Sequence, residues 1–490
     1  MTAAPVRGNT AGRKRAAAVA GAALVLAGSA GVAVLSHRVL PGDLALRGPI
    51  LPMVSVLVLG ALGYVLACTN LSRLPSSPIG FALVLVVAIA AAAVQLASKP
   101  VGNTDYARYL IDGGAVACGD NPYRLTPSER SRARATLSAL AWSDDPPCFL
   151  DDPRWEQVFH LVENGGEVTP YPPLAALWFG AVVRAFGPSL LALRVSFLLA
   201  ELALLVVLAL LLERLGLTLL AVAVVGWAPL MFKEIVNSAH YDAVPALLLT
   251  LSLLFLANRK WVASLAVLGC VVAAKLFAVV LLPLWLRAVD PGRRGWPATL
   301  FVAGAVVWWL PFAGAGINVL AGVGGLATAA VANAPIFPSL AGRLAETVRD
   351  PALARAVLAA CLLAGVTTLG LFYPVRSGGR VDVTRVARGA ALILAISIVC
   401  GPLASPWYFV WILPLAAVDL RPSWLVLVAT LPLFYLRYSM VPGSYAEHAW
   451  LVPWLEFGPP VLVALLEPLY LNRSSSRGRT RSAARPSPAL

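Results

Sequence analysis

Two polar stretches interrupt this largely apolar sequence and carry residue types that can move protons or bind phosphate. Residues 103–123, NTDYARYLIDGGAVACGDNPY, directly follow an apolar run, and residues 231–242, MFKEIVNSAHYD, separate two others. A positioned carboxylate can act as a general base. Cationic side chains stabilise the charge that builds on a phosphate oxygen. If the chain brings these groups together, the chemistry they predict is deprotonation of a hydroxyl group beside a phosphate.

Eight side chains are the candidates for this chemistry. The candidate for a catalytic role is Asp105. The candidates for substrate binding are Tyr106, Asp112, Tyr171, Lys233, His240, Asp242 and Lys275.

Most of these residues also have an ordinary structural explanation. Asp105 and Asp112 could be solvated loop or capping carboxylates, and Asp242 could cap the following helix. Lys275 could extend to the interface, although an ionisable residue in an apolar segment suggests function. Tyr171 precedes two prolines that could simply begin a helix.

The composition indicates an integral membrane protein. The chain has 490 residues, of which 59% are hydrophobic and 13% charged, and its mean hydropathy is +0.80. Backbone groups in lipid must be satisfied within helices, so the expected fold is all-α and polytopic. The net charge of +14 does not indicate nucleic acid, because the basic residues fall in short segments between apolar runs.

The basic segments set the expected topology. RKR at residues 13–15 precedes an apolar run at 16–35, so the N-terminus is expected in the cytoplasm. A cleaved signal peptide is the alternative, but the run is longer than a usual signal core. Spans at 50–68 and 79–97 then place residues 99–170 outside.

The segment YPPLAALWFGAVVRAFG decides the rest of the topology. As a spanning helix it would place three basic turns outside, whereas as an interfacial helix it places them inside, so we favour an interfacial helix. The first external loop then covers residues 99–189 and a second covers 317–350. The remaining spans are expected at 190–212, 217–231, 242–257, 261–274, 276–289, 297–313, 352–373, 389–402, 406–419, 423–436 and 450–471.

This map predicts one transmembrane domain over residues 1–471, with about 12–14 helices, and a plasma-membrane protein whose termini are both cytoplasmic. Residues 472–490 are Ser/Arg-rich and are expected to be a disordered basic tail. Cys118 and Cys148 lie in the first external loop, where an oxidising exterior would allow them to pair. Two free thiols are the alternative.

The external carboxylate, the nearby cations and the membrane frame together suit sugar transfer from a lipid phosphate. The donor's tail would lie in the bilayer, and its phosphate would need Lys, Arg or His. No nucleotide-sugar donor is expected on that side of the membrane.

At these residues the sequence resembles the GT-C superfamily of polyprenyl-phosphate-sugar glycosyltransferases. It is most similar to the glycosyltransferase 87 (DUF2029) mannosyltransferases of actinobacteria and less closely similar to the related α-1,6-mannosyltransferases. The matching segments are TDYARYLIDGGAVACGDNPY, YPPL, NSAHYDA, AAKLFAVVLLPLWL and SPWYFVWILPLA.

The resemblance implies a GT-C-like bundle with external juxtamembrane helices. Asp105 would deprotonate the acceptor hydroxyl with inversion at the sugar, while His240, Asp242 and Lys275 orient the donor phosphate and Tyr171 shapes the cleft. It implies a polyprenyl-phosphate mannose donor and an envelope glycolipid or lipoglycan acceptor. A long insertion in the first external loop leaves the acceptor open. A divalent cation also stays open, because Asp105 and Asp112 alone do not establish a metal site.

Two other classes of protein are alternatives to a transferase. A lipid or sugar transporter, or a flippase, usually shows repeated halves and several intramembrane charges, whereas the polar residues here concentrate in external segments. A non-catalytic envelope-assembly protein, or an enzyme such as a polymerase or ligase, is the second alternative.

Overall fold

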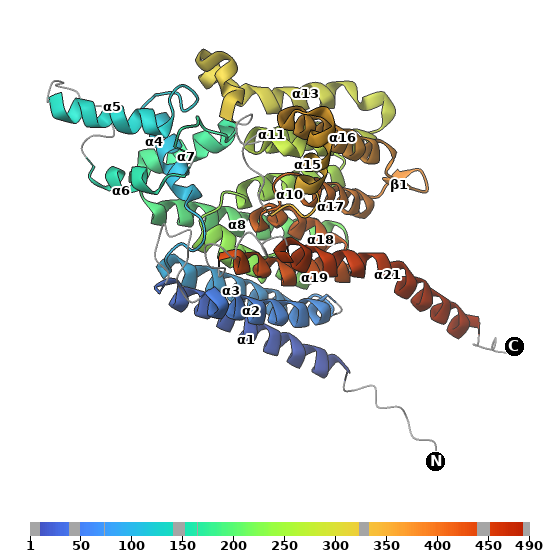
Figure 1. The fold of residues 1–490 in the computed structure, drawn as a ribbon. Helices are drawn as coiled ribbons and strands as arrows, with labels where there is room; N and C mark the ends of the chain where they lie inside the picture. The colour runs from blue at the N-terminus through green and yellow to red at the C-terminus, as the bar shows by residue number, and fades with distance from the viewer. Residues whose placement is uncertain are drawn as a thin grey trace, which may run out of the picture.

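The structure is a computed structural model that describes residues 10–38, 50–72, 74–140, 152–163, 165–322, 333–438 and 451–483. It is almost entirely helical (Figure 1), which confirms the predicted all-α class. Up to residue 257 the elements are α1 (Thr10–Ser36), α2 (Ile50–Leu71), α3 (Pro78–Val94), η1 (Gln95–Ala97), α4 (Asp105–Ala117), α5 (Pro127–Leu140), α6 (Arg154–Leu161), α7 (Pro173–Phe186), α8 (Leu190–Arg214), η2 (Leu219–Val222), α9 (Ala223–Gly226), the π-helix η3 (Met231–Asn237) and α10 (Ala243–Ala257).

The second half of the chain continues the bundle and adds one short hairpin. Its elements are α11 (Trp261–Ala274), η4 (Leu276–Leu281), α12 (Leu282–Ala288), η5 (Pro291–Arg293), α13 (Gly295–Val306), η6 (Val307–Leu320), α15 (Phe337–Val348), α16 (Pro351–Phe372), β1 (Arg376–Ser377), β2 (Arg380–Val381), α17 (Val383–Val399), η7 (Pro406–Ile412), α18 (Leu413–Val418), α19 (Pro422–Thr430), η8 (Leu431–Tyr438) and α21 (Leu451–Ala483).

Six helices in the described part of the chain are long and apolar enough to cross a membrane. They are Ala11–Ser36, Ile50–Leu71, Pro78–Ala97, Leu190–Arg214, Gly295–Gly316 and Pro351–Phe372. Leu219–Gly226 and Met231–Asn237 would make a seventh span if counted together, bent by 56°. Several other predicted spans are apolar helices of 10–17 residues, such as Ala243–Ala257 and Trp261–Ala274.

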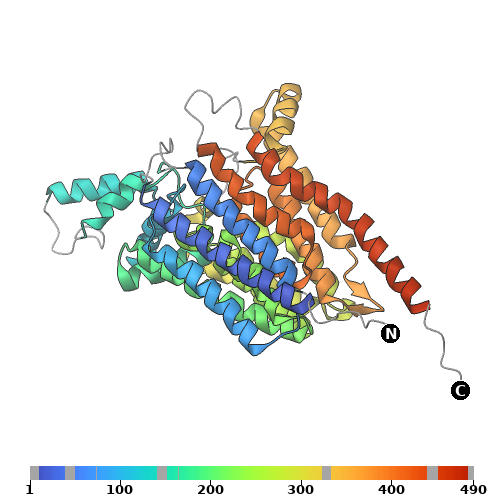
Figure 2. The same cartoon turned by 90° about the horizontal axis from the view of Figure 1, so that it is seen from below.

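The two ends of the bundle carry different parts of the chain. In Figures 1 and 2, the start of α1, the end of α21 and the β1–β2 hairpin lie at one end, and α5 and α6 project at the other. This arrangement agrees with the predicted topology, in which both termini lie opposite the first large loop. The compartment that each end faces stays a prediction from the basic residues.

Small residues allow close helix contact where α1 packs on α2. Gly21 and Gly28 on α1 face Gly63 and Gly60 on α2 so closely that a Cβ atom on Gly21 or Gly28 would collide with the other backbone. Such contacts stabilise helix pairs in membranes, where apolar burial alone gives little driving force.

Several finer expectations can be compared with the structure. Cys118 is disulfide-bonded, while Cys148 lies outside the described residues. Helix α21 continues to Ala483, so the boundary that we predicted at residue 471 falls inside a helix.

Candidate active site

Asp105 is the first residue of α4, and its neighbours fix its position. The Asn103 side chain accepts the Asp105 backbone N–H at 2.6 Å, and a carboxylate in the first turn is favoured by the helix dipole. Further along α4, Gly113 packs against the backbone of Phe179 on α7, where an added Cβ would lie 2.7 Å from the Phe179 carbonyl group. Gly113 therefore sets how closely α4 approaches α7 at this point.

The second polar stretch forms an irregular turn that ends in His240. Its helix η3 has π-helical hydrogen bonding, and Ala239 follows with a φ of +58°. Both features are uncommon and tend to occur at functional sites. They direct the fully buried His240 ring against Trp407, with ring centroids 4.0 Å apart and planes 14° apart.

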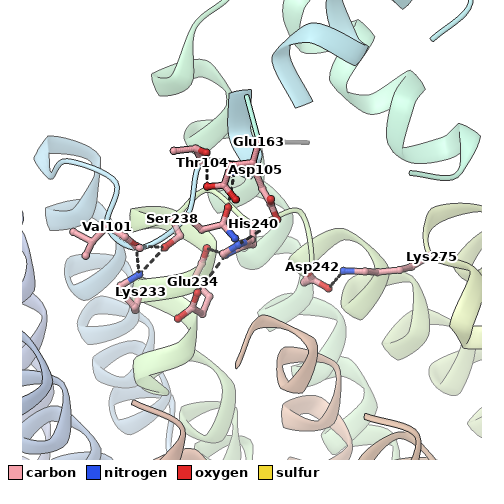
Figure 3. A network of polar contacts seen from close by, with 12 residues as sticks. Val101, Thr104, Asp105, Glu163, Lys233, Glu234, Ser238, His240, Asp242 and Lys275 are labelled. Atoms are coloured by element: carbon pink, nitrogen blue, oxygen red, sulfur yellow. Dashed lines mark hydrogen bonds and ion pairs between the residues drawn. The ribbon is translucent and has the colours of Figure 1, made fainter. Parts of the chain in front are cut away.

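His240 lies between two acidic side chains. Its Nε2 atom is 3.8 Å from Asp105 Oδ2, and its Nδ1 atom is 3.3 Å from Glu234 Oε2. Figure 3 shows the imidazole between these carboxylates, one from α4 and one from η3. The structure thus brings Asp105 and His240 together as predicted, and it adds Glu234.

Tyr435 on η8 connects Glu234 to Lys233. The Tyr435 hydroxyl donates to Glu234 Oε1 at 2.6 Å and accepts from Lys233 Nζ at 2.8 Å. The Lys233 ammonium also donates to the Val101 carbonyl and the Ser238 hydroxyl. All three of its donors therefore have partners inside the protein, so in this structure Lys233 supports the site and does not face a substrate.

Asp242 and Lys275 form a second charged pair beside His240 (Figure 3). Asp242 is buried and also accepts from the Trp411 indole at 3.0 Å. It occupies the position before α10 but makes no side-chain capping hydrogen bond, so the capping alternative is not observed. The Lys275 ammonium lies 4.4 Å from the centre of the Tyr408 ring. Because the Lys275 side chain is 14% exposed, its other N–H groups can reach a ligand.

The loop before α4 is tied to η3 by buried hydrogen bonds. Arg194 on α8 donates to the carbonyl groups of Ser98 and Asn237. Asn237 in turn donates to the Ser98 hydroxyl at 2.7 Å and to the Lys99 carbonyl at 2.8 Å. Because this loop leads into Asp105, these hydrogen bonds hold the Asp105 carboxylate in position beside His240.

The other predicted residues make no hydrogen bond or ion pair with Asp105 or His240 among the described residues. Asp112 is buried inside α4 and pairs with Arg108 at 3.2 Å, so it has a structural partner but is neither the solvated loop carboxylate nor the capping carboxylate considered for it. Tyr106 is 5% exposed. Tyr171 is half-buried and meets the edge of Tyr109 at 5.0 Å, so it can still shape an opening.

The surroundings of Asp105 change its acid–base behaviour. Burial raises the pKa of the Asp105 carboxyl above its usual range, although His240 and Lys275 oppose this change. The side chain is nevertheless 28% exposed. A partly accessible carboxylate with a raised pKa is a stronger base than an ordinary aspartate.

Metal binding has no clear geometric basis in the described part of the chain. No group of three or more His, Cys, Asp or Glu side chains there could hold a metal ion. The sequence left a divalent cation open, and the described residues add no support for one.

Glu234, Tyr435, Trp407 and Trp411 were not among the predicted site residues. Glu234 lies in a stretch that the sequence singled out, and the two tryptophans lie in the segment SPWYFVW, so a weak signal was present. Tyr435 had none, because it is 201 residues from Glu234.

Comparison with known proteins links the chain to mannosyltransferases. Residues 166–289 match the family model described as "Alpha-(1->6)-mannopyranosyltransferase, N-terminal domain". The matched range includes Tyr171, His240, Asp242 and Lys275, whereas Asp105 precedes it.

A curated relative supports the same link. Alpha-(1->6)-mannopyranosyltransferase A of Mycobacterium tuberculosis is 26% identical over 394 residues, which cover 74% of this chain and 70% of the relative. Among solved structures, ArnT from Cupriavidus metallidurans, crystallised with undecaprenyl phosphate, aligns over 82% of this chain and 79% of its own, with a TM-score of 0.40 and 14% identity.

The two sequence matches confirm the resemblance to membrane mannosyltransferases and support the prediction of a glycosyltransferase. Of the two groups that the sequence resembles, they name the α-1,6-mannosyltransferases.

Proposed function

We propose that this protein transfers a hexose, most simply mannose, from a polyprenyl-phosphate donor to a hydroxyl group of an envelope glycolipid or lipoglycan. Asp105 is the base, and the sugar carbon inverts. The reaction takes place at the external face of the plasma membrane, at the end of the bundle opposite the two termini.

The observation that carries this proposal is the position of Asp105. Its carboxylate is partly exposed at the start of α4, beside His240 and close to the Asp242–Lys275 pair. A base and a partly exposed ammonium group at one site suit attack by a hydroxyl group on a carbon whose leaving group is a phosphate.

The proposed step balances as follows. Asp105 takes the proton of the acceptor hydroxyl while its oxygen forms a bond to the sugar's anomeric carbon. On the opposite face of that carbon the bond to the phosphate oxygen breaks, and the electron pair stays on the polyprenyl phosphate. Lys275 donates to a phosphate oxygen as its negative charge grows.

Mannose is the preferred sugar because the relative is named a mannopyranosyltransferase. The lipid-phosphate donor is supported by the membrane setting of the site, where an apolar chain can lie in the bilayer and its phosphate can reach the bundle end. The tyrosines near the site, Tyr171 and Tyr408, are half-buried and would border the sugar.

The test is a transfer assay with the purified full-length protein in lipid. Radiolabelled polyprenyl-phosphate mannose is supplied with a crude envelope-lipid extract, and GDP-mannose and other polyprenyl-phosphate hexoses serve as comparison donors. We expect a labelled glycolipid from the polyprenyl donor. Label transferred only from GDP-mannose would refute the proposed donor. Donor moved across the bilayer without any product would support a flippase instead.

A further inference from the structure

Resting on the proposed function, we propose that His240 and Glu234 form a proton relay behind Asp105. His240 Nε2 receives from Asp105 the proton that Asp105 removes from the acceptor hydroxyl, and Glu234 stabilises the resulting imidazolium. In the resemblance described above, His240 would instead orient the donor phosphate, so the two roles can be separated by experiment.

The relay follows first from the hydrogen that His240 must carry on Nδ1. This atom lies 3.2 Å from the Glu234 backbone oxygen and 3.3 Å from the Glu234 carboxylate. Both are acceptors, so Nδ1 carries the hydrogen and Nε2 of the neutral ring presents a lone pair. Among the described residues, Nε2 has no hydrogen-bond partner.

The second argument is the atom that this lone pair faces. Asp105 Oδ2 lies 3.8 Å from Nε2, and two acceptors that face each other gain from sharing one proton. The pair is therefore arranged to hold a single proton, which belongs to both groups and not to either alone. Because the ring is fully buried and stacked on Trp407, a small shift of Asp105 closes the gap without moving the imidazole.

The third argument is the charge on Glu234. Its Oε1 accepts from the Tyr435 hydroxyl, and the Lys233 ammonium donates to the same hydroxyl. A carboxylate held by a donor and a nearby cation stays ionised. It therefore supplies a fixed negative charge next to Nδ1, where an imidazolium needs it.

Other charged or titratable groups also act on this pair and must be considered in any pH experiment. On α4, Arg108 acts on Asp105. Glu163 precedes α7 and its side chain accepts from the Thr104 hydroxyl at 2.9 Å. The remaining groups around the pair are Asp242, Lys275, Lys233, Tyr109, Tyr171, Tyr408 and Tyr435.

In the relay each proton is accounted for. The acceptor O–H bond breaks as the proton passes to Asp105 Oδ2, and the proton then moves to His240 Nε2. Asp105 is ionised again, and the imidazolium is flanked by two carboxylates. When the product leaves, the proton returns through the partly exposed Asp105 to water.

The pH dependence of kcat/KM for mannose transfer tests the relay. The donor is a phosphodiester that keeps one negative charge throughout, so titration belongs to the protein. In the wild type the pair must be free of its proton, and activity is lost as the pH falls. Glu234→Gln removes the charge that holds the proton, so the loss moves to lower pH by roughly one unit or more. Its kcat also falls by about tenfold.

Matched variants distinguish the relay from a structural role. Glu234→Asp retains the negative charge, so the pH at which kcat/KM is lost on acidification, the acid limb of the profile, should return toward its wild-type value. Glu156→Gln removes an exposed carboxylate on α6 and should leave the profile unchanged. Reduced activity of Glu234→Gln with an unmoved acid limb would overturn the relay. So would activity that falls as the pH rises through the imidazole range, because it would mean that an imidazolium binds the phosphate.

A second measurement does not need transfer activity. Trp407 stacks on His240, and an imidazolium quenches indole fluorescence more strongly than a neutral ring. The difference in emission between the wild type and Trp407→Phe should therefore follow the shared proton. Its midpoint should move to lower pH in Glu234→Gln. An unmoved midpoint would refute the relay even if every donor failed in the transfer assay, a failure that would count against the proposed function alone.

Discussion

Lys275→Met separates the structural role of the Asp242–Lys275 pair from its role in binding. Asp242 is 1% exposed at its side chain, and its nearest cation is the Lys275 ammonium. Without Lys275, the carboxylate keeps only the Trp411 indole as a hydrogen-bond donor among the described residues. The single variant therefore leaves a buried charge without compensation.

The size of the effect follows from that burial. Breaking a buried ion pair from one side typically costs about 3–5 kcal/mol. Lys275 is 14% exposed, so water can partly replace it, and we expect about 3 kcal/mol. In the double variant Lys275→Met, Asp242→Asn, the neutral amide oxygen can still accept from Trp411, and most of this loss should be recovered.

The assay is a double-mutant cycle of unfolding free energies in mixed micelles, with mannose transfer measured on the same samples. The double variant should regain stability yet remain at least about tenfold less active, because the donor phosphate has lost its ammonium. Recovery of activity together with stability would refute a phosphate-binding role for Lys275. A single variant as stable as the wild type would refute the buried pair.

Three further predictions concern the supports of the site. The single variant Arg108→Met should destabilise the protein by about 3 kcal/mol, because it leaves the buried Asp112 carboxylate without its ion-pair partner. The double variant Arg108→Met, Asp112→Asn should lose much less stability, and equal losses for the two variants in micelle unfolding would contradict this. Ala239→Gly should stabilise the protein by up to about 1 kcal/mol with activity unchanged, because Ala239 has a φ of +58°, which glycine adopts at a lower cost than alanine. Destabilisation would show that the packing of the alanine methyl group outweighs this gain. Gly113→Val should lower kcat at least about tenfold without loss of folded protein, because the valine side chain would push α4 away from Phe179 and so displace Asp105. Normal transfer would show that the position of Asp105 does not depend on this contact.

Apolar runs were sufficient to predict the helical bundle. The helix predicted at the interface corresponds to α7, which begins at Pro173. Its start could be predicted because proline is common in the first turn of a helix. The count of spans was harder to predict, since several apolar segments are short or bent.

The candidate site was only partly predictable. Asp105, His240, Asp242 and Lys275 stood out because polar residues beside apolar runs are conspicuous. The enclosure of Lys233 was not readable, because one of its partners, Tyr435, is 202 residues away. Nor does the sequence show a π-helix or the positive φ of Ala239, which depend on tertiary packing around the turn.

The role of Asp105 as the base is tested most directly by comparing Asp105→Asn with the wild type and with Glu163→Gln. Glu163 is an exposed acid near Asp105, so its variant controls for the loss of a nearby charge. We expect a folded Asp105→Asn protein whose mannose transfer falls by about 10²-fold or more, with Glu163→Gln close to the wild type. Equal transfer by Asp105→Asn and the wild type would contradict the assignment of Asp105 as the base.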